Sequence, residues 1–299
     1  MDRQNRTIVV FGATGRQGGA VARHLASEGW RVRGVSRNPA GARAQALRDV
    51  GVEMVQADMG DRSSLDRTLE GAYGVFSVQN YWMYGYGPEI RQGINVADAA
   101  HAAGIQHLVY SSVGGAERNT GVSHFESKWR IEQRIRELEL PATIVRPVFF
   151  MENLLGWVHH DPENNLWTMR MPMPPDRPLQ MIAVTDIGGF VALVFDDAGR
   201  FRGEALELAG DEVSMSQAAR MISQHLGEPV EYAEMPMDEH RAQSPESADM
   251  FAWFIRAGYQ ADIAALRQMY PPLLTFGEWL DRVGFADRLR ERQVDRSRA

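Results

Sequence analysis

A glycine-rich segment at residues 9–19 reads VVFGATGRQGG, and it follows a short β-branched run and precedes a helix-like stretch. Such a strand, loop and helix is the context that a phosphate-binding turn requires. Gly12 permits a tight turn, Gly15 leaves room for a diphosphate beside the backbone, and Gly18 lets the helix pack closely. The N–H groups of the first helical turn then bind the phosphates. A glycine turn with a purely structural role is the alternative, which this context disfavours.

The end of the second apolar run indicates which dinucleotide fits. NAD-binding sheets usually carry an Asp or Glu about 20 residues after the glycines, to bond the ribose hydroxyls. Here residues 34–39 read GVSRNP, and the guanidinium of Arg37 suits a 2′-phosphate. This predicts NADP(H), preferred over NAD(H); the alternative is that Arg37 is a solvated surface charge. We expect Asp58 either to contact the adenine amino group or to cap the following helix.

The first half alternates short β-branched runs with amphipathic stretches, as βαβ units do. This predicts an α/β fold, a Rossmann-type doubly wound parallel sheet with helices on both faces. The expected strands are 7–11, 31–36, 53–56, 74–77, 107–111 and 142–146. The expected helices are 18–28, 40–50, 63–69, 89–103 and 125–138.

The second half has a less regular pattern. Five prolines in residues 156–180 predict an irregular covering segment rather than further sheet. A strand at 204–208 and a helix at 214–226, capped by Ser214, are expected next. We therefore expect a dinucleotide-binding domain over residues 1–155, to which a strand and helix around 182–226 return. Residues 156–181 and 227–299 are expected to form a smaller, mainly helical C-terminal substrate or partner lobe.

Composition excludes several classes of protein. The sequence is 44% hydrophobic and 24% charged, which is enough to bury a core and excludes intrinsic disorder. Its net charge of −7 argues against direct binding to nucleic acid. The absence of cysteine predicts a cytoplasmic protein without disulfides. With no long apolar run, no membrane association is expected. No metal site is expected either, and His159, His160 and Asp161 are expected in a loop.

Residues after the fifth expected strand point to a known superfamily. Ser111 and Ser112 end that strand, and the next helix begins with Ser-His-Phe-Glu-Ser-Lys at residues 123–128. With the glycine loop, this resembles the short-chain dehydrogenase/reductase superfamily. That superfamily has a Ser near the strand end and a Tyr-x-x-x-Lys on the helix, the Tyr being the general acid. His124 stands in place of the Tyr, so the usual proton donor is missing.

Four further segments narrow the resemblance. They read QNYW at 79–82, EIRQG at 89–93, HFESKWRIE at 124–132 and FFMENLL at 149–155. Together they resemble the NmrA-like family of atypical short-chain dehydrogenases over about residues 5–285. That family includes fungal nitrogen-metabolite regulators, a human NADPH sensor, and bacterial quinone or azo reductases.

The resemblance implies a set of cofactor contacts. The pyrophosphate lies on the glycine loop, the 2′-phosphate on Arg37, and the nicotinamide ribose on Lys128. Asp58 faces adenine, and the last four residues of the set flank the nicotinamide ring. The implied set is Gly12, Ala13, Thr14, Gly15, Arg16, Gln17, Gly18, Arg37, Asp58, Gln79, Asn80, Tyr81, Lys128, Phe150, Met151, Glu152 and Asn153.

Lys128 and His124 are the candidate catalytic residues. Lys128 is the single lysine among 32 basic residues, which indicates a need for a compact ammonium with three donors; chance survival is the alternative. His124 has three interpretations: a replacement general acid, a helix N-terminal residue without a chemical role, or a group that positions a ligand. Ser111 and Ser112 either polarise a substrate carbonyl or close the strand end.

Two functions are favoured by these features. The first is an NADP(H)-responsive regulator that binds a protein partner according to redox state. The second is an NADPH-dependent reductase of a quinone, azo or enone substrate, because quinone reduction needs little acid assistance. A DNA-binding repressor is disfavoured by the net charge. Either a monomer or a homodimer is compatible with the sequence.

Overall fold

The structure is a computed structural model that describes residues 3–161 and 164–297. The chain forms two compact units. The first unit contains Met1–Pro147 and Val184–Leu208, and the second contains Val148–Ala183 and Ala209–Ala299.

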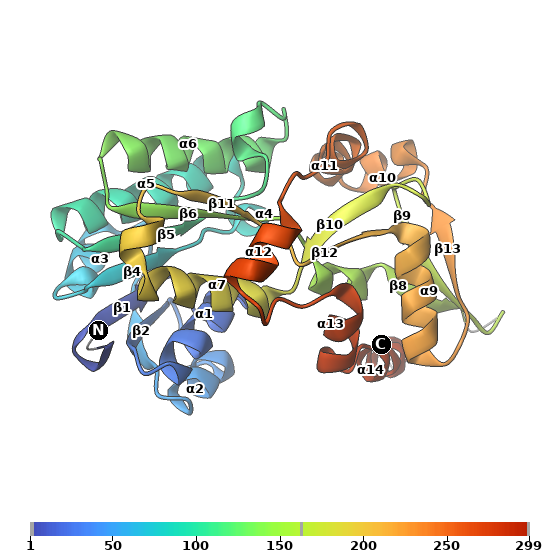
Figure 1. The fold of residues 1–299 in the computed structure, drawn as a ribbon, viewed down its shortest axis with the longest axis horizontal. Coiled ribbons are helices and arrows are strands. Elements are labelled where there is room, and N and C mark those ends of the chain that lie inside the picture. The colour runs from blue at the N-terminus through green and yellow to red at the C-terminus, as the bar shows by residue number, and fades with distance from the viewer. Residues whose placement is uncertain (1–2, 162–163, 298–299) are drawn as a thin grey trace. The chain divides into compact units, whose positions relative to one another are not determined.

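A seven-stranded parallel sheet forms the centre of the first unit, in the order β11-β6-β5-β4-β1-β2-β3 (Figure 1). The direction of winding reverses between β1 and β4, which makes the sheet doubly wound and confirms the expected fold class. All six strands expected in the first half are present, and β11 is the strand expected at 204–208. The strands are β1 (Thr7–Val10), β2 (Arg31–Ser36), β3 (Glu53–Gln56), β4 (Gly74–Ser77), β5 (His107–Ser111), β6 (Ala142–Pro147) and β11 (Ala205–Leu208).

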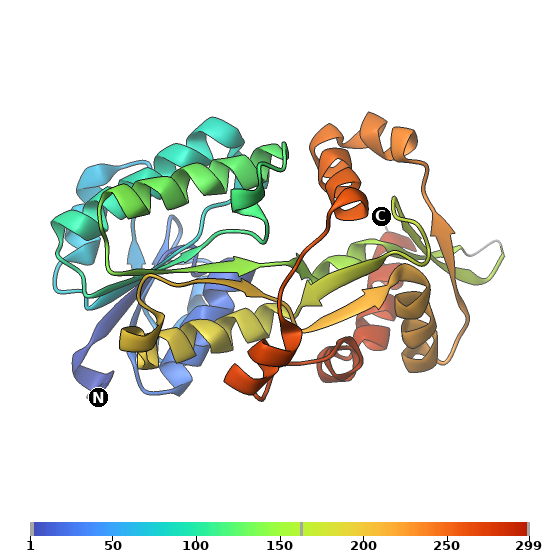
Figure 2. The same ribbon diagram turned by 45° about the horizontal axis from the view of Figure 1, so that its top comes forward.

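Helices cover both faces of this sheet (Figures 1 and 2). One face carries α1 (Arg16–Ser27), α2 (Ala42–Arg48) and α7 (Val184–Asp196), and the other carries α3 (Arg62–Leu69), α5 (Tyr86–Ala102) and α6 (Ser123–Glu137). Short helices complete the unit: η1 (Arg3–Asn5), α4 (Tyr81–Tyr84), η2 (Ala116–Arg118) and α8 (Ala198–Phe201). This arrangement places α5 beside α6.

Glycine 93 allows α5 and α6 to approach closely. A Cβ atom at Gly93 would lie 2.4 Å from Ile131 Cδ1 on α6, nearer than real Cβ contacts come. Ile131 itself is fully buried. The close approach holds the first turns of both helices in register, and those turns carry residues of the site described below.

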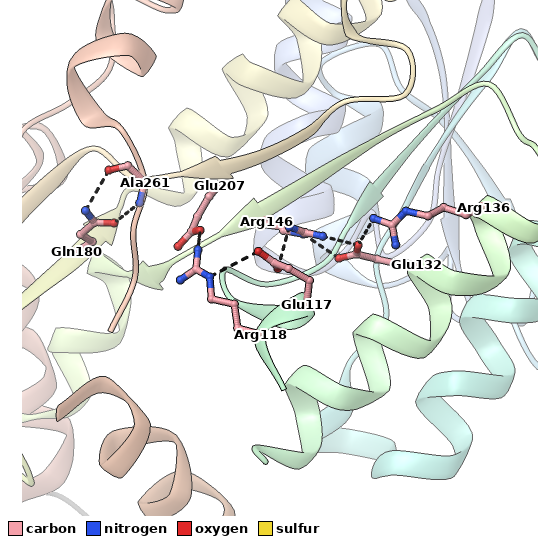
Figure 3. Close-up of polar contacts among 8 residues, drawn as sticks. All are labelled: Glu117, Arg118, Glu132, Arg136, Arg146, Gln180, Glu207 and Ala261. Atoms are coloured by element: carbon pink, nitrogen blue, oxygen red, sulfur yellow. Dashed lines mark hydrogen bonds and ion pairs between the residues drawn. The ribbon is translucent and has the colours of Figure 1, made fainter. Parts of the chain in front are cut away.

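The second unit contains two three-stranded sheets as well as helices. The sheets have the orders β12-β10-β7 and β13-β9-β8. Gln180 of β10 exchanges two hydrogen bonds with the backbone of Ala261, at 2.9 and 3.1 Å (Figure 3). The elements are β7 (Phe149–Phe150), η3 (Met151–Gly156), β8 (Val158–Asp161), β9 (Leu166–Met171), β10 (Pro178–Ile182), β12 (Asp211–Ser214), α9 (Met215–Leu226), β13 (Val230–Glu234), α10 (Met237–Gln243), α11 (Pro245–Arg256), α12 (Ile263–Met269), α13 (Phe276–Val283) and α14 (Phe285–Ser297).

The expected irregular segment at residues 156–180 is wrong for the residues described, because β8, β9 and the start of β10 lie there. Pro172, Pro174 and Pro175 fall between β9 and β10, where they interrupt no strand. Pro178 is the first residue of β10, a position at which a strand tolerates proline. Residue 162 lies outside the described residues.

The boundaries of the two units also differ from the expected ones. Ser214 does cap α9, through a capping box with Gln217, as predicted. The helix nevertheless belongs to the second unit, where it packs on β13, and only Val184–Leu208 returns to the first unit. The second unit begins at Val148 instead of residue 156, because β7 pairs with β10.

None of the described helices combines the length and apolar character that spanning a bilayer requires.

Candidate functional site

The predicted cofactor residues of the first unit lie at one edge of its sheet. Gly12, Arg37, Asp58 and Gln79 follow β1, β2, β3 and β4, and Ser111 ends β5. These five strands are neighbours in the order β5-β4-β1-β2-β3, so their carboxyl ends share an edge. Doubly wound sheets bind ligands at this edge, next to the reversal of strand order. The tertiary structure thus places at one edge residues that lie up to 99 positions apart in the sequence.

The glycine loop has the shape that a diphosphate needs. Gly12 has a φ of +67°, a conformation that favours glycine, and its carbonyl accepts a hydrogen bond of 2.8 Å from the N–H of Gly15. A Cβ atom at Gly18 would lie 2.3 Å from that same carbonyl oxygen. Gly15 is the N-cap of α1 and makes no side-chain cap hydrogen bond, so it leaves the first N–H groups of α1 without a bond from a capping side chain. Ala13 and Thr14 complete the loop, and Arg16 is the first residue of α1.

Ser111 and Gln17 fix this loop to the sheet. The Ser111 hydroxyl is fully buried and donates a hydrogen bond of 2.7 Å to Gln17 Oε1. The neighbouring hydroxyl of Ser112 is also buried, and it has no hydrogen-bond partner in the described part of the chain. Ser111 is thus held by Gln17, whereas the Ser112 hydroxyl has no partner among the described residues, and the roles of both serines stay a prediction.

Arg37 is exposed, but it lies against α4. Its guanidinium carbon is 5.3 Å from the centre of the Tyr84 ring, and Nη2 is 3.4 Å from Met83 Sδ. A cation over an aromatic face is attracted by the electron density of the ring. Arg37 is therefore partly oriented by α4 before any ligand binds, which a freely solvated charge would not be.

Asp58 does not cap the following helix, so that alternative is wrong. Asp61 is the N-cap of α3 and accepts a hydrogen bond from the N–H of Ser63 at 3.0 Å. Asp58 Oδ1 accepts one from the N–H of Gly60 at 2.7 Å, which closes a local turn after β3. The contact of Asp58 with adenine stays a prediction.

Gln79, Asn80 and Tyr81 connect β4 to α4. The buried amide of Gln79 donates to Ser77 Oγ at 2.9 Å, while its Oε1 has no partner among the described residues. Asn80 caps α4, and Tyr81 donates its hydroxyl hydrogen to Ser123 Oγ at 2.9 Å. An unpaired buried amide oxygen is costly, and a polar ligand would satisfy it.

His124 is the second residue of α6, so it does lie at a helix N-terminus. Its side chain is buried among aromatic rings, with ring centres 5.5 Å from Tyr81, 5.1 Å from Trp82 and 4.8 Å from Phe125. Its three interpretations are not separated by these contacts, and its chemical role stays a prediction.

Lys128 lies one helical turn after His124 and donates a hydrogen bond of 3.1 Å to Glu89 Oε1 on α5. The other carboxylate oxygen of Glu89 accepts a short hydrogen bond from Ser127. Glu89 has no exposed surface, while 12% of the Lys128 side chain is exposed. The ammonium is therefore anchored at one side and accessible at the other.

The remaining predicted contacts, Phe150 to Asn153, belong to the second unit. Met151 is fully buried there, and Glu152 accepts a hydrogen bond of 3.1 Å from Trp279 Nε1. Phe150 and Asn153 are partly exposed. Their contact with a nicotinamide ring stays a prediction.

His159, His160 and Asp161 are placed on a strand, β8, so the expected loop is wrong. His160 Nδ1 is 2.8 Å from Gln293 Nε2. Within the described part of the chain, no three His, Asp or Glu side chains are grouped as ligands for a metal ion.

Three residues of the site were missed as functional candidates. Glu89 lies within the EIRQG segment, but its contact with Lys128, 39 positions away, depends on the packing of two helices. Met83 and Tyr84 lie in the aromatic segment 81–86, and their exposure beside Arg37 has no sequence signal of its own. In the sequence, the one feature that could have indicated Glu89 as a site residue is a charged side chain at a helix position expected to be buried.

Comparison with known proteins now identifies the family. The profile of the NmrA-like family matches residues 4–280, which is most of the chain. The chain belongs to the NmrA-like family. The expected family is thereby confirmed.

Relatives of this NmrA-like protein include enzymes and regulators. A (4-alkanoyl-5-oxo-2,5-dihydrofuran-3-yl)methyl phosphate reductase of Streptomyces griseus is 33% identical, over 78% of this chain and 79% of the relative. The nitrogen metabolite repression protein nmrA of Emericella nidulans is 29% identical, over 82% of this chain and 72% of the relative. The crystal structure of NmrA, a negative transcriptional regulator, in complex with NADP has a TM-score of 0.78 and 25% identity, covering 92% of this chain and 94% of that one.

Proposed function

We propose that the first unit binds NADP(H) and that the protein acts as a cofactor-responsive regulator. The glycine loop and the uncapped start of α1 would hold the diphosphate, Arg37 the 2′-phosphate, and Lys128 the nicotinamide ribose. The unpaired Gln79 Oε1 and the Ser112 hydroxyl are further groups that a polar ligand would satisfy. The NADP complex of the neighbour NmrA supports this proposal.

The observation that carries the regulatory role is the combination of Lys128 with His124. Lys128, which would bond the ribose, is kept and anchored, whereas the tyrosine that would deliver a proton is replaced by a histidine buried among aromatic rings. Binding chemistry is thus retained while the usual proton donor is absent. The similarity to nitrogen metabolite repression proteins supports the same role.

A reductase is the second candidate, favoured by the similarity to a dihydrofuran phosphate reductase. When bound, NADPH would supply a hydride from its nicotinamide ring. The residues of this chain would then bind and orient the cofactor through Lys128 and the glycine loop. His124 or water would provide a proton, and quinone, azo and enone substrates are the expected classes.

Cofactor affinity tests the binding proposal. We expect NADPH to bind more tightly than NADH in titration calorimetry, by roughly tenfold or more, because Arg37 adds a charge-assisted contact to the 2′-phosphate. Arg37→Ala should weaken NADPH binding and leave NADH binding unchanged. Since NmrA is described in complexes with both NADP and NAD, equal affinity for the two cofactors would refute the preference and retain the fold.

NADPH consumption separates the regulator from the reductase. The purified protein is incubated with NADPH and a panel of quinones, azo dyes and cyclic enones, and the absorbance of NADPH is followed. A regulator should show no turnover above background, while NADPH should still raise its melting temperature. Turnover that is lost in Lys128→Met would instead establish the reductase.

A further inference from the structure

We infer that Glu89 is a positioning residue for Lys128, setting the place and the charge balance of the ammonium that meets the cofactor. This inference rests on the proposed binding of NADP(H). Glu89 lies on α5, and Lys128 and Ser127 lie on α6. The carboxylate of Glu89 is shared between the two α6 residues, with one oxygen for each.

Burial makes this contact more than a surface ion pair. Glu89 and Ser127 have no exposed surface, and 12% of the Lys128 side chain is exposed. A buried carboxylate without a cation would be strongly unfavourable, so Glu89 and Lys128 keep each other in place. The close packing of Gly93 on Ile131, one turn further along both helices, fixes the distance between α5 and α6.

The hydrogen-bonding capacity of the ammonium gives the pairing its use. An ammonium has three N–H donors, and Glu89 accepts one of them. Two donors remain for ribose hydroxyls. The side chain of a free lysine has four rotatable bonds, so holding it before the cofactor arrives lowers the entropic cost of binding.

A guanidinium would not serve equally well in this place. Its five donors form a broad rigid fork, of which one carboxylate oxygen would satisfy only a part. This explains physically why the one lysine of the chain stands beside Glu89, while the other 31 basic residues are arginines.

A double-mutant cycle on NADPH affinity tests the inference. The variants are Glu89→Gln, Lys128→Met and the double variant, each measured by titration calorimetry. We expect Lys128→Met to weaken binding roughly tenfold and Glu89→Gln about three- to tenfold, since each removes a charge-assisted contact or its support. The double variant should bind no more weakly than Lys128→Met alone, because Glu89 acts through Lys128.

Asp98→Asn is the matched control. Asp98 also lies on α5 and also pairs with a basic residue of α6, Arg134, at 2.9 Å. Arg134 is about two turns of helix from Lys128. The same change from acid to amide there should leave NADPH affinity unchanged. If Glu89→Gln fails to fold, Ser127→Ala replaces it, with a smaller loss of affinity that again disappears in the Lys128→Met background.

The single lysine also allows a readout without cofactor. Labelling lysine with ¹³C at Cε gives one side-chain signal in the NMR spectrum, from Lys128. We expect that signal to shift in Glu89→Gln and to stay in place in Asp98→Asn.

The outcomes distinguish this inference from the function on which it rests. If the wild type binds neither dinucleotide, both proposals fail. A second set of outcomes starts from a wild type that binds NADPH and a Lys128→Met variant that binds it more weakly. If Glu89→Gln then leaves NADPH affinity unchanged, only the role of Glu89 is overturned. The same conclusion follows if Glu89→Gln weakens NADPH binding equally in the wild type and in Lys128→Met. An unmoved Lys128 signal in Glu89→Gln would overturn it as well.

Discussion

Two buried ion pairs on α6 differ in how completely their donors are used. Lys128 pairs with Glu89, and one turn later Glu132 pairs with Arg146 of β6. Both carboxylates are fully buried, and the two cations are almost equally exposed, at 12% for Lys128 and 9% for Arg146. Burial alone therefore does not separate the proposed binding residue, Lys128, from a structural one.

Arg146 is bonded to two carboxylates (Figure 3). Arg146 donates to both oxygens of Glu132, at 3.0 and 2.7 Å, and pairs with Glu117 at 2.8 Å. Glu132 also accepts from Arg136, and Arg118 joins Glu117 to Glu207 of β11. Lys128, in contrast, gives one hydrogen bond to its partner. A cation bonded to several carboxylate oxygens stabilises the fold, whereas an anchored cation that gives only one bond to its partner is suited to a ligand.

We expect the largest effect on stability when the Arg146 network loses Glu132. Glu132→Ala leaves the Arg146 guanidinium buried without its bidentate partner, and we expect a loss of about 3–5 kcal/mol in the free energy of unfolding. Urea denaturation measures it. The control is Arg136→Ala, which removes a half-exposed partner of the same carboxylate and should cost about 0–1 kcal/mol. Equal costs for the two variants would contradict the distinction.

His107 extends the comparison to a buried group without an ionic partner. Burial, and secondarily the charge of Arg202, lowers its pKa to about 4. Thr143 Oγ1 donates to the Phe201 carbonyl and so accepts from His107 Nε2. The buried Nδ1 has no hydrogen-bond partner among the residues that the structure describes. The folded state therefore holds a neutral imidazole, while the unfolded state takes up a proton below its ordinary pKa of about 6.5.

This linkage predicts a pH dependence of stability. The contribution of His107 is fully present above pH 6.5 and is lost as pH falls toward 4, by up to about 1.4 kcal/mol per pH unit. Urea denaturation at pH 7 and pH 5 should show a larger fall in the wild type than in His107→Gln, which does not titrate there. An identical fall in both proteins would show that His107 titrates normally.

Exchanging the two cations tests the comparison directly. Arg146→Lys should lower the unfolding free energy by about 2 kcal/mol, because a lysine cannot make the bidentate contact, and should leave NADPH affinity unchanged. Lys128→Arg should leave stability nearly unchanged and weaken NADPH binding about tenfold, because the broader fork does not fit beside the ribose. Urea denaturation and titration calorimetry separate the two effects. If both variants lose stability and affinity together, the two pairs are not functionally distinct.

The smallest effect is expected at an exposed cation, Arg37. Its contact with the Tyr84 ring is worth about 0.5–1 kcal/mol at an exposed site, so Tyr84→Leu should reduce the preference for NADPH over NADH two- to fivefold or so. Tyr84→Phe keeps the ring and should retain the preference. Calorimetric affinities for both cofactors give the ratio. A loss in Tyr84→Phe as large as in Tyr84→Leu would show that the hydroxyl, and not the ring face, orients Arg37.

The sequence by itself determined the elements of the first unit. Strands buried on both faces appear as short β-branched runs, and the glycine spacing marks the turn after β1, because both signals are local. The residues from Gly12 to Gln79 that follow successive strands could be placed at one sheet edge for the same reason. The family followed from short motifs.

The fold of the second unit could be predicted less completely from the sequence. Prolines near β9 and β10 suggested an irregular chain, but pairing with distant strands decided otherwise, as β13 does for β9. Strand formation there depends on partners some 60 residues away, which no local pattern reports. The boundary at Val148 likewise depends on the pairing of β7 with β10.

Tertiary structure alone decided which polar groups meet. Lys128 was evident as the single lysine, but its partner Glu89 becomes visible only when α5 and α6 pack together across Gly93. The same holds for Arg37 on Tyr84, and for Asp58, because capping, one of its two predicted roles, is taken by Asp61. Residue types set the available charges and donors in the sequence, whereas the distances that make them a site arise from long-range packing.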